Sequence, residues 1–120
     1  MDLLHQVMAN LEVDEGKAEK GIGALLMALR MSVDKDTFEK AKQAIPTAER
    51  MMGHSLMSGG RTGEMAMMAG PGALMVSLAA AGFDKDDVPR LARLVLEHLR
   101  PTITGANVDK FYEQAPALKA

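Results

Sequence analysis

The sequence contains three copies of one helix-start pattern, an apolar residue followed at once by aspartate. Asp14, Asp34 and Asp84 each follow an apolar residue, and a second apolar or small residue stands four positions after each aspartate. Aspartate at such a position accepts hydrogen bonds from the free amides of a first helical turn, and the flanking pair can pack as a hydrophobic staple. The pattern predicts helices that begin near residues 15, 35 and 85.

Apolar residues recur at helical spacing after two of these starts, which predicts amphipathic helices over 15–31 and 85–100. In the first the stripe is Ala18, Ile22, Leu25 and Leu29, and in the second it is Val88, Leu91, Ala92, Val95 and Leu99. The opposite face of the second helix carries Arg90, Arg93, Glu97 and Arg100. Pro101 is expected to end that helix.

The segment 71–81 is apolar nearly all round from Ala73 onward, which is typical of a buried helix. Gly82 suits a left-handed helix end, with Phe83 folding back on the last turn. Shorter helices are expected over 2–10, 35–44, 47–52 and 107–115, and a loop rich in glycine and methionine near 53–63. No segment shows the alternation of a strand.

These elements predict an all-α fold, a compact bundle of five to seven helices that forms a single domain over residues 1–120. The chain length is ordinary for one domain. The helices over 15–31, 71–81 and 85–100 are expected to form its core. Because aromatic residues make up only 3% of the chain, that core must consist mostly of aliphatic side chains.

Residues 65–83 carry no charge over a length that approaches a membrane span. The string Gly70-Pro71-Gly72 interrupts the segment and no basic cluster flanks it, so we expect a buried helix and not a span. The first residues lack the basic and long apolar regions of a signal peptide, and a cytoplasmic location is expected. The net charge of −2, without a basic stripe, argues against nucleic acid as a partner.

The residue patterns of known reaction sites are missing, so we expect no catalytic residues, no cofactor and no metal site. The aspartate clusters lack the glycine and glutamate of an EF-hand loop, and cysteine is absent. The three histidines are scattered, and His98 borders an apolar helix face, where a half-buried packing role is expected. An enzyme would need His54 or His98 to meet a carboxylate at hydrogen-bond distance.

Methionine is the unusual component: the chain has 11, and most of them lie between residues 51 and 75. Three interpretations stay open, namely core packing, a pliable surface for a partner helix or lipid-like ligand, and a thioether site for Cu(I). The residues of the candidate surface are Met51, Met52, Met57, Met65, Met67 and Met68.

Several strings of small and apolar residues resemble the VcgC/VcgE family of bacterial proteins. In the first half they are Leu11-Glu-Val13, Ala18, Gly21-Ile-Gly23-Ala-Leu-Leu26, Phe38 and Ala44-Ile45-Pro46; in the second they are Leu78-Ala-Ala-Ala-Gly82-Phe83, Val88, Val95-Leu96 and Leu99. The resemblance covers about residues 11 to 100. It implies a helical domain of unknown function and supplies no activity and no catalytic residues. It also allows a location in the cell envelope, although the leader that some members carry is missing here.

The chain has a surplus of apolar residues and no pattern of a reaction site. The main functional hypothesis is therefore a non-enzymatic interaction module, self-association included. The alternative is a carrier that holds a small apolar or lipid-like ligand in a cavity between helices.

Overall fold

The computed structural model describes residues 3–45, 48, 50, 78, 82–84 and 86–114. Its described helices are α1 (Leu3–Leu11), α2 (Glu15–Ser32), α3 (Lys35–Ala44), α7 (Asp87–Ile103) and α8 (Gly105–Gln114). No strand occurs within these residues. The all-α prediction is therefore confirmed. The helices expected from the sequence over 2–10, 15–31, 35–44, 85–100 and 107–115 are present, and none of their ends is shifted by more than three residues.

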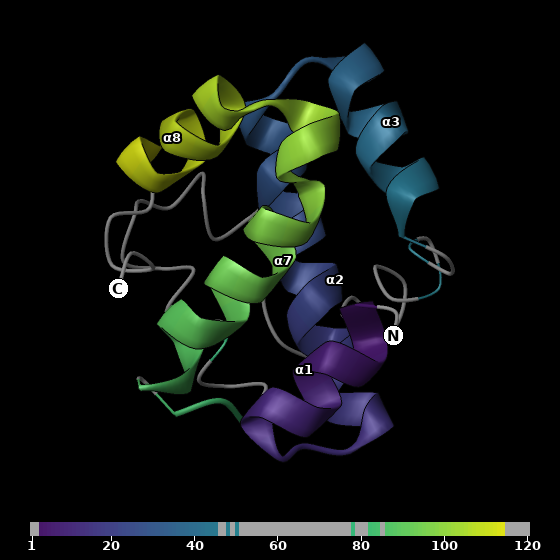
Figure 1. Ribbon diagram of the computed structural model, residues 1–120, viewed down its shortest axis with the longest axis vertical. Coiled ribbons are helices and arrows are strands. Elements are labelled where there is room, and N and C mark those ends of the chain that lie inside the picture. Colours follow the sequence, from purple (N-terminus) through teal and green to yellow (C-terminus); the bar gives the residue numbers. More distant parts are fainter. Residues whose placement is uncertain are drawn as a thin grey trace.

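Helix α7 is the centre of the described bundle. It contacts α1, α2, α3 and α8, and α2 in turn contacts α1, α3 and α8. Figure 1 shows α7 crossing in front of α2, with α3 and α8 on either side of its C-terminal end and α1 near its N-terminal end. The expectation that the segments 15–31 and 85–100 form the core is thus confirmed.

The core is built almost entirely from aliphatic side chains. Leu, Ile, Val and Ala make up most of it, with the phenylalanines at 38, 83 and 111. Helix α7 buries the stripe that its spacing predicts, extended by two residues: Val88, Leu91, Ala92, Val95, Leu96, Leu99 and Ile103. Its arginines and Glu97 are exposed, as expected. Met8, whose side chain is described, is half-buried at the edge of this core.

Two of the three predicted aspartate caps are confirmed. The Oδ1 atom of Asp14 accepts the backbone N–H of Lys17 at 2.8 Å, and Oδ1 of Asp34 accepts that of Thr37 at 2.7 Å. Both aspartates have the extended backbone of an N-cap residue. Each side chain satisfies an amide that the helix itself leaves without a partner.

The third predicted cap, Asp84, is wrong. Helix α7 begins at Asp87, after Asp86, which has a helical backbone and makes no side-chain cap bond. Asp84 instead uses its backbone carbonyl, which accepts from the amides of Asp87 at 2.9 Å and Val88 at 3.1 Å. A turn of the main chain therefore satisfies the amides that a side chain was expected to cap. The apolar residues of the pattern, Phe83 and Val88, are both buried.

The prediction that Pro101 ends the preceding helix is also wrong, because α7 continues to Ile103. A proline removes one donor to the turn before it, a small loss in the last turn of a helix. The two further residues bring Ile103 into the core, where its side chain is fully buried. The helix ends when the amide of Thr104 donates to the carbonyl of Arg100 at 2.9 Å.

Gly82 is left-handed, with φ of 104°, as predicted from the sequence. The amide of Phe83 donates to the carbonyl of Leu78 at 3.1 Å, the bond that closes a Schellman helix end. Glu12 forms the same end after α1 with φ of 54°, and there the amide of Val13 bonds the carbonyl of Met8.

Several predictions concern residues outside the described part of the chain. The loop near 53–63 lies there, as do the segments 47–52 and 71–81 apart from Ala48, Arg50 and Leu78, which are helical. The uncharged segment 65–83 is described only at Leu78, Gly82 and Phe83. Within the described residues, no helix has both the length and the apolar character needed to cross a membrane.

Candidate functional site

All six methionines of the candidate surface lie outside the described residues. The prediction for Met51, Met52, Met57, Met65, Met67 and Met68 is therefore not tested by contacts of their side chains. The structure does describe how the chain is held on either side of them, at Arg50 and at Gly82 and Phe83. Both places contact the first half of α2.

Arg50 holds the chain on one face of α2 through an ion pair. Its Nη2 atom lies 2.6 Å from Oε1 of Glu19 and 3.6 Å from Oε1 of Glu15. The Glu19 side chain is only 6% exposed, whereas that of Arg50 is 59% exposed. A carboxylate that leaves water needs partners, so Glu19 gives the chain a defined position for Arg50.

Phe83 holds the chain on another face of α2. A β-carbon at Gly21 would lie 2.6 Å from Cζ of the Phe83 ring, so only glycine permits this approach. The ammonium of Lys17, one turn earlier, lies 5.3 Å from the centre of the same ring. Leu78 and Phe83 are both buried, and the left-handed Gly82 between them directs Phe83 toward α2.

Glu19 and Gly21 are two residues apart, which places them about 200° apart around a helix of about 3.6 residues per turn. Arg50 therefore meets the face of α2 that carries Glu15 and Glu19, and Phe83 meets the face that carries Lys17 and Gly21. The chain between Arg50 and Phe83 leaves one side of α2 and returns to another. The six methionines belong to this part of the chain.

His98, which an enzyme hypothesis would need, packs between two helices. It is half-buried, as predicted, and its Nε2 lies 3.3 Å from the carbonyl oxygen of Ala44 on α3. His5 is exposed on α1, and His54 lies outside the described residues. Among the residues the structure describes, no three His, Asp or Glu side chains are placed to hold a metal ion.

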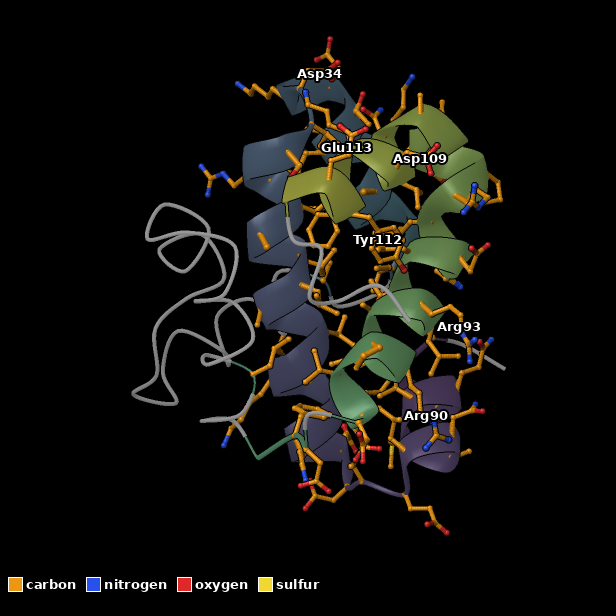
Figure 2. The ribbon with its side chains drawn as sticks, turned by 90° about the vertical axis from the view of Figure 1, so that its left-hand side faces the viewer. Asp34, Arg90, Arg93, Asp109, Tyr112 and Glu113 are labelled. Atoms are coloured by element: carbon orange, nitrogen blue, oxygen red, sulfur yellow. The ribbon has the colours of Figure 1, made fainter. Side chains whose placement is uncertain are left out.

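A charged face runs along the outer side of α7 toward α8. Arg100 binds Glu97 through two bonds, from Nε to Oε2 at 3.0 Å and from Nη2 to Oε1 at 2.9 Å. This bond holds the pKa of Glu97 below its ordinary value and raises the pKa of Arg100. Figure 2 shows Arg90 and Arg93 along the same helix.

Tyr112 lies at the edge of this face, on the side of α8 that approaches α7 (Figure 2). Burial of the phenol raises its pKa, and the Glu97 carboxylate adds to that rise, while Arg100 and Arg93 oppose it. Its ring also meets the Phe111 ring edge-on, at 6.3 Å between centres. At neutral pH the phenol is protonated and offers a hydrogen-bond donor, not a base.

The ion pair between Glu19 and Arg50 was missed in the sequence analysis. The sequence does indicate that Glu19 is unusual, because it stands directly after Ala18 and one turn before Ile22 in the apolar stripe of α2. An acid at such a position is seldom buried without a partner. Nothing in the spacing indicates which of the basic residues that partner is.

One of three comparisons with known proteins found a match. The model of the family described as "Protein of unknown function VcgC/VcgE" matches residues 1–99, which includes α1, α2, α3 and most of α7. A search of the curated proteins found no match. A search of the solved structures found none either. The match covers most of the chain, and the protein belongs to the VcgC/VcgE family.

Proposed function

We propose that the protein is a non-enzymatic interaction module that binds a protein partner, a second copy of the chain included, through its methionine-rich segment. The surface is formed by Met51, Met52, Met57, Met65, Met67 and Met68. The thioether side chain is unbranched and polarisable, so a surface rich in methionine adapts to partner helices of different shape.

One observation carries the proposal: the side chains whose burial is described form a core of other residue types. Five helices bury leucine, isoleucine, valine, alanine and phenylalanine against each other. Met8, a described methionine, packs at the edge of that core and is only half-buried. The contacts among these described side chains are made without the six methionines.

The two attachments to α2 support the same proposal. Arg50 pairs with Glu19, and Phe83 packs on Gly21. The chain is therefore held on α2 both before and after the methionines. Such an arrangement limits the conformational entropy that the intervening segment loses when it binds a partner.

The test compares the wild-type chain with a variant in which all six methionines are replaced by glutamine, which has a similar length and a polar end. Light scattering after size-exclusion chromatography measures association, and native mass spectrometry of the purified protein identifies bound molecules. We expect the glutamine variant to lose a complex that the wild-type chain forms, with an unchanged helical circular dichroism spectrum. Replacement of the same residues by leucine is the matched control and should keep binding.

Two results would contradict the proposal. One is a glutamine variant that associates like the wild type. The other is a glutamine variant that unfolds while the leucine variant stays folded, because the methionines would then be part of the core. A small apolar molecule that is released from the wild-type chain in the mass spectrometer would favour the carrier hypothesis instead.

A further inference from the structure

The junction between α7 and α8 consists of one residue, Thr104. Its amide donates to the carbonyl of Arg100 at 2.9 Å and closes the last turn of α7. Its carbonyl accepts the amide of Val108 at 3.2 Å and opens the first turn of α8. The chain therefore turns from one helix into the next at a single residue.

Thr104 adopts a backbone conformation that suits glycine. Its φ of 76° and ψ of 153° lie in a region that residues with a β-carbon rarely occupy, and a β-branched residue is strained there. The glycine stands one place later, at Gly105, which packs under Arg100: a β-carbon there would lie 3.1 Å from Nη1 of that residue. The sequence thus has threonine at the position whose backbone conformation favours glycine.

Burial of α8 keeps the strained turn in place. Val108 and Phe111 are fully buried, and α8 contacts both α2 and α7. A helical conformation at Thr104 would remove the strain and join α7 and α8 into one longer helix. It would also expose Val108 and Phe111 and leave their site on α2 and α7 empty, which disfavours opening in an isolated chain.

We propose that α8 is exchanged between two copies of this chain. In the exchanged dimer each Thr104 is helical, and the α8 of each copy fills the site on α2 and α7 of the other. The buried contacts of Val108 and Phe111 are then kept, while both strained turns are released. Short strained connections between elements favour such an exchange, which reuses existing contacts and needs no new interface. The exchange uses none of the six methionines and does not depend on the function proposed above.

Substitutions at Thr104 test the role of the strained turn. Thr104→Gly relieves the strain in the monomer and disfavours the joined helix. The dissociation constant of the dimer should therefore rise about tenfold or more, given the size of such strain. Thr104→Ala keeps a β-carbon and favours the helix, so its dimer should be at least as tight as that of the wild type. Glu12→Gly relieves the cost of a positive φ far from the junction and should leave dimerisation unchanged. Sedimentation equilibrium measures all four dissociation constants.

Spin labels identify the exchange itself, because the chain has no cysteine of its own. Arg93→Cys on α7 and Glu113→Cys on α8 place labels at two exposed positions (Figure 2). A doubly labelled monomer gives the distance between them within one chain. We expect the same distance between chains in the dimer formed by mixing the two singly labelled proteins.

The absence of a dimer at about 1 mM protein, a concentration that detects even weak association, would overturn the exchange. A dimer that lacks the interchain distance would overturn it as well. If that dimer disappears when the six methionines are replaced by glutamine, it belongs to the interaction surface proposed above. A dimer that keeps the distance in the glutamine variant supports the exchange alone.

Discussion

The ring of Phe83 lies on Gly21 so closely that a β-carbon at position 21 would be 2.6 Å from its Cζ and 2.7 Å from its Cε2. The same added atom would lie 2.8 Å from Cδ2 of Leu91 on α7. Gly21 is thus the point at which α2, α7 and the chain before α7 come together. Phe83 is buried, so its ring is enclosed by protein at this contact.

Gly21→Ala should lower the free energy of unfolding by about 1–2 kcal/mol, because the strain of an overpacked core exceeds the gain in helix propensity. Urea unfolding followed by circular dichroism measures the change. Phe83→Leu is the matched second substitution, since it removes the ring that the new methyl group meets. The double variant should lose less than the sum of the two single losses. Additive losses would mean that Gly21 and Phe83 are not in contact.

Asp14→Ala should lower the free energy of unfolding by about 1 kcal/mol, because the amide of Lys17 loses its acceptor. Asp86→Ala is the control: Asp86 also precedes a helix but makes no side-chain cap bond, so its loss should stay within about 0.5 kcal/mol. Equal losses at the two positions in thermal or urea unfolding would contradict the assignment of the caps.

The pKa of Asp34 is lowered from 3.8, chiefly by the hydrogen bond from the Thr37 amide. A carboxyl group whose pKa is lower in the folded state stabilises the protein fully above its unfolded-state pKa and loses that effect as the pH falls through the folded value. The stability of the wild type should therefore fall more steeply below pH 3.8 than that of Asp34→Asn, which keeps a capping side chain but does not titrate. Unfolding curves at a series of acid pH values measure both slopes. Parallel slopes would show that Asp34 does not contribute to acid sensitivity.

Phe111→Ala should lower the free energy of unfolding by about 3–5 kcal/mol, since the ring is fully buried. Helix α8 lies beyond residue 99, where the family match ends, yet it packs on α2 and α7. The neighbouring Lys110 is exposed, and Lys110→Ala should change stability by less than about 0.5 kcal/mol. A small effect at both positions would show that α8 is not part of the cooperative unit.

Much of the described fold could be predicted because its signals are local. The spacing of Ala18, Ile22, Leu25 and Leu29 defines the buried face of α2, and Asp14 and Asp34 sit beside the amides that they cap. Gly82 was predictable for the same reason, since a left-handed helix end depends on the residue itself. The extension of α7 past Pro101 was missed because burial of Ile103, a tertiary contact, outweighs one lost hydrogen bond.

The attachments around the candidate surface could not be predicted from the sequence. The ion pair of Glu19 and Arg50 joins residues 31 positions apart, and the contact of Gly21 with Phe83 joins residues still more distant in the chain. Helical periodicity predicts that a face is buried but does not identify the residue that covers it. The strained turn at Thr104 was missed because threonine carries no turn signal, and the geometry follows from the docking of α8.

The most direct test of the proposed function is the accessibility of the methionine methyl groups, measured by NMR on the full chain labelled at those methyls. A soluble paramagnetic agent should broaden the signals of Met51, Met52, Met57, Met65, Met67 and Met68 in the dilute monomer more than that of Met8, which is half-buried in α1. In the associated state the six signals should become protected while that of Met8 stays unchanged. Six signals already protected in the monomer would place these residues in the core and contradict the account.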